Sequence, residues 1–145
     1  MESASDVFYT IYDWYDGARD GAATFQGAPH RYRSVYLDTP SWDPDEDRFE
    51  LTPISADLLG AMVEADRLWR RWDEARRAGT LPPEGPDDPR ALPEDRERYE
   101  ALLARIVAEL GALKPTVLAR GEFDYQNGRV RWTPIAHGAW RLTNR

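Results

Sequence analysis

The residues best suited to chemistry are crowded into one short stretch, DWYDGARDG, which runs from Asp13 to Gly21. An aromatic ring held beside carboxylates can stack on a sugar face or on a cationic side chain, while the carboxylates accept hydrogen bonds. We therefore take the following as candidate binding residues: Asp13, Trp14, Tyr15, Asp16, Arg19 and Asp20. The alternative is a structural turn, in which Asp-Gly supplies the geometry, Arg19 pairs with a neighbouring aspartate and both rings join the core.

Another candidate binding residue, Trp42, lies in the acidic segment DTPSWDPDED. Its neighbours are loop formers, so we expect an exposed indole that could anchor a partner; the alternative is that Trp42 caps the mouth of a barrel. Aspartates 43, 45 and 47 have the spacing of the first ligands of a calcium-binding loop. However, Arg48 stands where that loop requires glycine and Ile54 where it requires glutamate. The sequence therefore indicates no metal site and no cofactor.

His30 is the residue that catalysis would use, and it is also a candidate binding residue. A small hydrolase would need His30, Asp13 and Asp16 to line one pocket, because a general base must be oriented by a carboxylate next to its target. The chain contains no nucleophile elbow, phosphate-binding P-loop, Rossmann glycine pattern or zincin motif. We therefore expect a protein that is not an enzyme, with a carboxylate- and histidine-dependent hydrolase as the alternative.

Charge is distributed unevenly along the chain. Residues 1–66 carry four arginines and fourteen acidic residues, whereas residues 67–145 carry fifteen basic and twelve acidic residues. An acidic first half would repel a phosphate backbone, so nucleic-acid binding is not expected. It would attract a basic partner, unless the arginines of the second half neutralise it within the molecule.

Composition limits the remaining classes of protein. The 145 residues include no cysteine and only two histidines, which excludes disulfides, a thiol nucleophile and cysteine-ligated metals. No segment approaches the ~20 consecutive apolar residues of a membrane span. We expect a cytoplasmic protein that does not bind membranes, and the sequence leaves a homo-oligomer open.

Short strands are predicted to position the candidate residues. The segment VFYTIYDWY, residues 7–15, is aromatic and β-branched on both faces, which favours a barrel stave or a central strand. In this strand Phe8, Thr10, Tyr12 and Trp14 would share one face. Further strands are expected at about 22–25, 30–37 and 48–52, with turns at each Asp-Gly pair.

Two helices and a hairpin follow. Helical spacing predicts helices at about 56–78 and 94–113, joined by a proline-rich loop at 80–93, with Trp69 and Trp72 on the buried stripe of the first helix. The dipeptide Asn127-Gly128 predicts a two-residue type I′ turn in a hairpin at 119–133. That turn would place Phe123 opposite Trp132 and Asp124 opposite Arg131.

Together these elements predict one α+β domain over residues 1–145. We expect a curled antiparallel sheet or small barrel of about six strands, with an antiparallel two-helix insertion before the C-terminal hairpin. The function we expect is non-catalytic binding of a protein partner or a small ligand, through an acidic and aromatic surface built from DWYDGARDG and the Trp42 segment. A carbohydrate-binding module is the other alternative. Each of these binding functions requires that some aromatic rings in the first third of the chain remain exposed.

Overall fold

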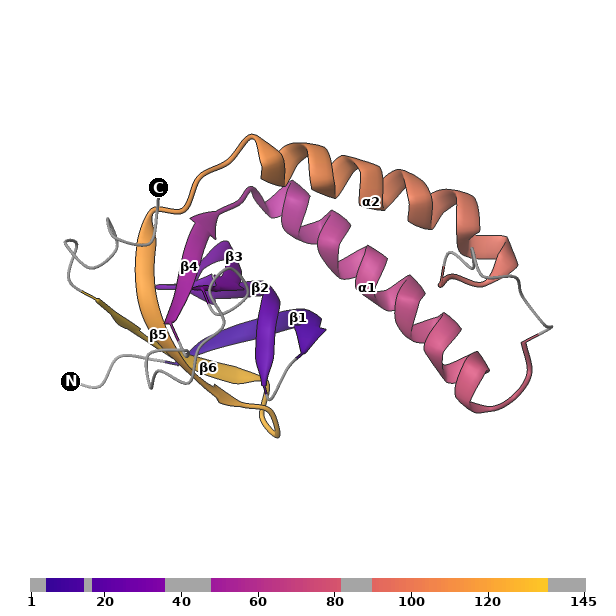
Figure 1. Ribbon diagram of the computed structural model, residues 1–145, viewed down its shortest axis with the longest axis horizontal. Helices are drawn as coiled ribbons and strands as arrows, with labels where there is room; N and C mark the ends of the chain where they lie inside the picture. Colours follow the sequence, from indigo (N-terminus) through magenta and orange to yellow (C-terminus); the bar gives the residue numbers. More distant parts are fainter. Residues whose placement is uncertain (1–4, 15–16, 36–47, 82–89, 136–145) are drawn as a thin grey trace.

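Six antiparallel strands and a pair of long helices are present in the computed structural model, which describes residues 5–14, 17–35, 48–81 and 90–135 (Figure 1). The strands are β1 (Asp6–Trp14), β2 (Ala18–Phe25), β3 (Ala28–Ser34), β4 (Arg48–Pro53), β5 (Val117–Asp124) and β6 (Arg129–Pro134). The helices are α1 (Ala56–Arg77) and α2 (Arg96–Gly111), and a short 3₁₀ turn at Pro93–Asp95 precedes α2.

The strands close into a barrel. Each strand pairs antiparallel with the next one in the chain, and β1 closes the sheet by pairing with β6. In this last pair Asp6 lies opposite Val130 and Val7 lies opposite Arg129. The predicted α+β fold, a small antiparallel barrel with two helices inserted before the C-terminal hairpin, is confirmed.

The two helices form an antiparallel hairpin that projects from one end of the barrel, with α1 nearer to β1 (Figure 1). Ser55 caps α1, since its hydroxyl accepts a hydrogen bond of 3.0 Å from the backbone N–H of Leu58. Ion pairs join the two helices, with Arg98 bonded to Glu64 and Arg105 bonded to Asp57. The apolar stripes of the helices meet between them and against the barrel, in a cluster that includes Ile54, Leu58, Met62, Leu68, Tyr99, Leu102 and Ile106.

Aromatic rings fill the barrel interior. Tyr32 lies at the centre, with ring centroids 5.8 Å from Phe49, 5.3 Å from Phe123 and 5.9 Å from Trp132. The buried polar atoms of these rings are paired: the Tyr32 hydroxyl donates to the Thr10 carbonyl at 2.8 Å, and the Trp132 indole N–H donates to the Thr24 carbonyl at 2.9 Å. Because their polar atoms are hydrogen-bonded, these large rings can be buried with little loss of free energy.

The predicted turn at Asp20-Gly21 is wrong, because both residues lie inside β2. Glycine is needed here for close packing rather than for a turn. A Cβ at Gly21 would lie 2.0 Å from the Thr10 carbonyl oxygen and 2.6 Å from the Tyr32 hydroxyl. Only a residue without a side chain lets β1 and the central tyrosine approach β2 this closely.

The predicted register of the β5–β6 hairpin is also wrong, by two residues. Phe123 lies opposite Val130 rather than Trp132, and residues 125–128 form a four-residue loop. The Asp124 carboxylate accepts hydrogen bonds from the backbone N–H and the side-chain amide of Asn127, at 3.3 and 2.7 Å. These bonds hold Asn127 at negative φ, whereas a type I′ turn needs positive φ at both central residues. A shift of two residues keeps the same side chains facing inward.

Candidate functional site

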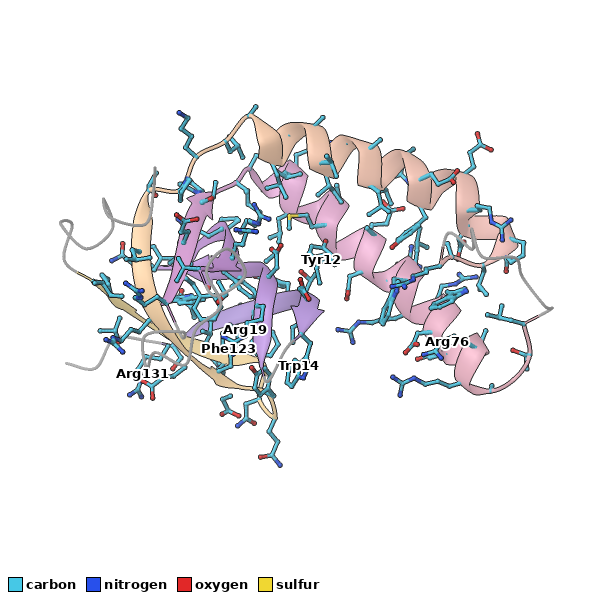
Figure 2. The ribbon with its side chains drawn as sticks, in the orientation of Figure 1. Tyr12, Trp14, Arg19, Arg76, Phe123 and Arg131 are labelled. Atoms are coloured by element: carbon cyan, nitrogen blue, oxygen red, sulfur yellow. The ribbon has the colours of Figure 1, made fainter. Side chains whose placement is uncertain are left out.

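Asp13 and Trp14, two of the candidate residues, lie at the end of β1 and are both exposed. Figure 2 shows Trp14 at the rim of the barrel. The pairing of β1 with β2 is irregular at three places along the strand. Such bulges re-aim the side chains that follow them. The predicted alternation is therefore not kept: Phe8 packs on the barrel interior, whereas the Tyr12 hydroxyl donates to the Met62 carbonyl of α1 at 2.7 Å.

An ordered stack of rings supports the exposed indole of Trp14. The indole is 57% exposed, and its ring centroid lies 5.0 Å from that of Tyr125 in the β5–β6 loop. Tyr125 in turn lies parallel to Phe123, at 5.5 Å and an interplanar angle of 7°. The Tyr125 hydroxyl accepts a hydrogen bond of 2.8 Å from the backbone N–H of Ala18, which fixes its orientation. Trp14 is thus held in place while most of its surface faces solvent.

Arg19 and Asp20 have different surroundings from Trp14. Arg19 is only 3% exposed and lines a pocket of about 260 Å³ at the barrel rim, together with Phe49 and Phe123. The Asp20 carboxylate accepts two hydrogen bonds from Arg31, both of 3.0 Å, which join β2 to β3. Among the described candidate residues, Asp13 and Trp14 are therefore the ones that face solvent.

His30 does not meet Asp13 in the described residues. His30 is buried, and its Nδ1 lies 2.9 Å from the Ala28 carbonyl oxygen, so this nitrogen carries the proton as the donor. In the sheet His30 lies beside Ala23 of β2, whereas Asp13 lies beside Asp20, three residues earlier in β2. The common pocket that a hydrolase would need is not formed by these two residues.

Several candidate residues lie outside the described part of the chain. They are Tyr15, Asp16, Trp42 and the aspartates 43, 45 and 47 of the acidic segment. Their contribution to a surface stays a prediction.

The structure adds a pocket that sequence reasoning missed, between β1 and the helices. It has a volume of about 140 Å³, and its lining includes Tyr12 of β1, Asp66 and Trp69 of α1, and Tyr99 of α2. Trp69 was expected on the buried stripe with Trp72, but it is only partly buried and faces this pocket. The spacing of Asp66 and Trp69, three residues apart on one helix, places them on the same side and was the available signal.

The ionisable side chains of the pocket's strand and helices are Tyr12, Asp66 and Tyr99. Arg70 donates to Oδ2 of Asp66 at 2.7 Å, but Arg70 itself is largely exposed. Burial raises the pKa of Asp66 above its ordinary value, and the Arg70 guanidinium offsets only part of this effect. Burial also raises the pKa values of Tyr12 and Tyr99, and the nearby Arg90 guanidinium partly lowers that of Tyr99. Both tyrosines are therefore neutral at neutral pH.

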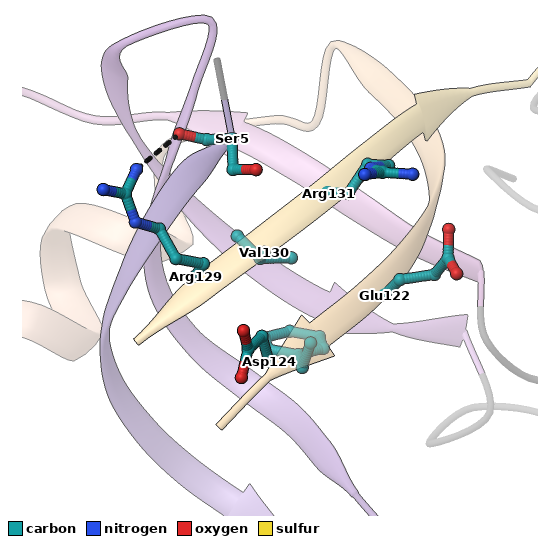
Figure 3. A pocket seen from close by; sticks show the side chains of 7 residues that line it. Ser5, Glu122, Asp124, Arg129, Val130 and Arg131 are labelled. Atoms are coloured by element: carbon teal, nitrogen blue, oxygen red, sulfur yellow. Dashed lines mark hydrogen bonds between the residues drawn. The ribbon is translucent and has the colours of Figure 1, made fainter. Parts of the chain in front are cut away.

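A pocket of about 320 Å³ lies on the outer wall of the β5–β6 hairpin (Figure 3). Opposite charges face each other across the strands here, with Glu122 opposite Arg131 and Asp124 opposite Arg129. Arg129 also donates to the backbone carbonyl of Ser5 at 3.3 Å. Balanced charges on a strand surface are explained by cross-strand pairing, so this pocket carries no functional argument.

Two negative findings concern the described residues alone. Within residues 5–14, 17–35, 48–81 and 90–135, no three histidine, aspartate or glutamate side chains are grouped so that they could hold a metal ion. Neither α1 nor α2, the long helices of this part of the chain, is apolar over a length that could cross a membrane.

Comparisons of this chain with protein-family models, with curated proteins and with solved structures find no match.

Proposed function

We propose that the protein is a non-catalytic binding protein that recognises a basic segment of a protein partner. The recognition face, as we define it, consists of Tyr12, Asp13 and Trp14 of β1 and of Tyr125 in the β5–β6 loop. Three of these four residues are aromatic and all are exposed. The rings of Trp14 and Tyr125 are in contact, with centroids 5.0 Å apart, and exposed rings grouped in this way are typical of surfaces that bind other molecules.

The observation that carries the proposal is the supported but exposed indole of Trp14. A tryptophan at a strand end is normally covered by its own protein, because burying its surface is favourable. Here the underlying ring is fixed by the hydrogen bond from Ala18 to Tyr125, and the indole is still 57% exposed. A rigid aromatic side chain loses little conformational entropy when a partner covers it, which makes it an efficient anchor.

Charge favours a basic partner over an acidic or neutral one. The protein carries a net charge of −7, and the exposed Asp13 is adjacent to Trp14. Asp20, which lies opposite Asp13, is already paired with Arg31. Asp13 is therefore the acid of this face that can pair with a cation from a partner, and a cation above the Trp14 ring would add a cation–π contact.

The proposal is tested by measuring the binding of defined peptides by fluorescence anisotropy. The panel contains lysine-rich, acetylated-lysine and glutamate-rich peptides of equal length, each measured at low and at physiological ionic strength. We expect the lysine-rich peptides to bind most tightly and to weaken with salt, since exposed charges are screened over ~10 Å at 0.1 M salt. Equal binding of lysine-rich and acetylated-lysine peptides would contradict the proposal.

The residue dependence is tested in the same assay. Trp14→Ala should weaken lysine-peptide binding about tenfold or more, as removal of an aromatic anchor costs ~2 kcal/mol. Val107→Ala is the matched control, because Val107 is an exposed apolar residue of α2 that lies outside the recognition face. The account fails if both variants bind the peptides equally well.

A carbohydrate partner is the second candidate, supported by the same exposed indole beside a carboxylate. Indole stacking on a sugar depends on apolar contact and hydrogen bonds and not on the charge of the ligand. A glycan array separates the two candidates. Binding of uncharged glycans that is lost in Trp14→Ala and is insensitive to salt would replace the basic peptide with a sugar.

A further inference from the structure

The pocket between β1 and the helices is built from three segments that are distant in sequence. Tyr12 comes from β1, Asp66 and Trp69 come from α1, and Tyr99 comes from α2. Its volume of about 140 Å³ is well below the ~300–1,000 Å³ of typical pockets for cofactors and drug-sized ligands. The space therefore suits one side chain of a partner rather than a whole small molecule.

Three aromatic rings line this pocket and are fixed in position. The Tyr12 hydroxyl is bonded to the Met62 carbonyl at 2.7 Å, so the ring is anchored at that end although part of it faces solvent. Tyr99 is buried, and the Trp69 ring packs at 6.3 Å from Trp72. Several aromatic rings around one small space attract a cation through their negative faces.

Asp66 supplies a carboxylate to the same space. Its side chain is only 12% exposed, and the hydrogen bond from Arg70 uses one of its two oxygens, Oδ2. The raised pKa of Asp66 is the sign of a carboxylate whose desolvation exceeds the compensation it receives. A second cation that approaches from the pocket would supply the compensation that Arg70 alone does not.

We propose that this pocket accepts the ammonium group of a lysine side chain from a protein partner, with Asp66 as the counter-ion and Tyr12, Trp69 and Tyr99 as the surrounding wall. The inference rests on the proposed function, because the same basic segment would contact Trp14, two residues after Tyr12. An ammonium is a compact charge on a slim alkyl chain, which matches a narrow pocket better than a planar guanidinium does.

Arg90 is a cationic side chain next to the proposed ammonium site. It lines the pocket, and its guanidinium is close enough to Tyr99 to offset part of the rise in the pKa of that phenol. Two cations next to each other repel, so Arg90 opposes the entry of a lysine ammonium. Arg90→Ala should therefore strengthen the binding of an ammonium probe, whereas a purely apolar pocket would be indifferent to this change.

The first test uses small probes, so that it does not depend on the partner or on Trp14. Butylammonium chloride and 1-butanol, which has nearly the same shape without the charge, are titrated into the isotopically labelled protein and followed by NMR. We expect butylammonium to shift the signals of the Trp69 indole and of the Asp66 backbone amide, and to bind about tenfold more tightly than butanol. Equal affinity for the two probes would overturn the proposal.

The second test removes the counter-ion. Asp66→Asn should weaken butylammonium binding about tenfold, because a charge-assisted contact becomes a neutral one. Asp57→Asn, which removes an exposed carboxylate near the start of the same helix, should leave binding unchanged. Unaltered butylammonium binding in Asp66→Asn would exclude the assigned counter-ion.

The pH dependence follows from the groups that face Asp66, namely Tyr12, Arg70, Arg90 and Tyr99. The tyrosines stay neutral and the arginines stay charged at and below neutral pH, so Asp66 is the group that titrates. Butylammonium binding should therefore weaken as the pH falls through the raised pKa of Asp66. Affinity that stays constant down to pH 3.5 would contradict the assignment.

Stability provides the folding control for these variants. A carboxyl whose pKa is raised by burial stabilises the fold in its protonated form, and this contribution is lost as the pH rises through the folded-state pKa. Asp66→Asn should therefore be at least as stable as the parent protein at pH 7, as measured by Tm.

The proposed function and the ammonium pocket can fail separately. If butylammonium binds in the pocket but Trp14→Ala leaves the binding of lysine-rich peptides unchanged, the proposed function fails and the ammonium pocket stands.

Discussion

The aromatic rings inside the barrel and those of the recognition face differ in what holds them. Inside, Tyr32 and Trp132 are buried and their polar atoms bond to backbone carbonyls. On the face, Tyr12 and Tyr125 are also fixed by hydroxyl hydrogen bonds, to Met62 and Ala18, yet both remain partly exposed.

This difference shows that an aromatic ring can be held in one orientation without being buried. An interior ring contributes to folding through the apolar area that it removes from water. On the recognition face, Tyr12 and Tyr125 are each ordered by one hydrogen bond and Trp14 packs on Tyr125, while the apolar surface of these rings stays available. The fold should therefore depend on the interior rings, and binding should depend on the exposed ones.

The largest effect on stability is expected from an interior ring. Trp132→Ala should lower the free energy of unfolding by about 3–5 kcal/mol, through lost burial and a cavity that the barrel cannot close. Urea denaturation followed by circular dichroism measures this loss. A decrease smaller than about 1 kcal/mol would mean that the interior rings do not determine stability.

A smaller but still large effect is expected at Gly21. Gly21→Ala should lower the free energy of unfolding by about 1–3 kcal/mol. The new Cβ would lie 2.0 Å from the Thr10 carbonyl oxygen, so the strands would have to separate. Gly60→Ala is the matched control on α1, where nothing lies within 4 Å of the added Cβ. The control should be more stable than the parent protein by about 0.5–1 kcal/mol, because alanine favours a helix.

Tyr125 connects the two regions and should show an intermediate effect. Tyr125→Phe removes the acceptor of the Ala18 N–H and should lower the free energy of unfolding by about 0.5–1.5 kcal/mol. It should also weaken peptide binding, since it frees the ring under Trp14. Tyr9→Phe is the control, because Tyr9 is an exposed tyrosine of β1 outside the recognition face. It should change neither the free energy of unfolding nor the peptide affinity.

Much of the fold could be predicted because it depends on local patterns. The helical spacing of residues 56–78 predicts α1, Ala56–Arg77, to within one residue. The errors come from contacts between distant residues. Gly21 is inside a strand because Thr10 and Tyr32 approach it, and the β5–β6 register follows from the side-chain bonds of Asp124 to Asn127.

The candidate site could be predicted only in part, for the same reason. The sequence places Trp14 beside an acid, but the bulges of β1 decide which side chains leave the barrel. The pocket of Tyr12, Asp66 and Tyr99 joins three elements whose approach depends on how the helical hairpin docks on β1. The spacing of Asp66 and Trp69 indicates that they share one side of α1, but it does not reveal a pocket that also needs Tyr12 and Tyr99.

The most direct test of the central claim measures stability and affinity together in Trp14→Ala. We predict that the free energy of unfolding changes by less than about 0.5 kcal/mol, as for a surface residue, while lysine-peptide affinity falls about tenfold or more. The opposite result, a protein destabilised by several kcal/mol whose remaining folded fraction binds lysine peptides as tightly as before, would contradict the account.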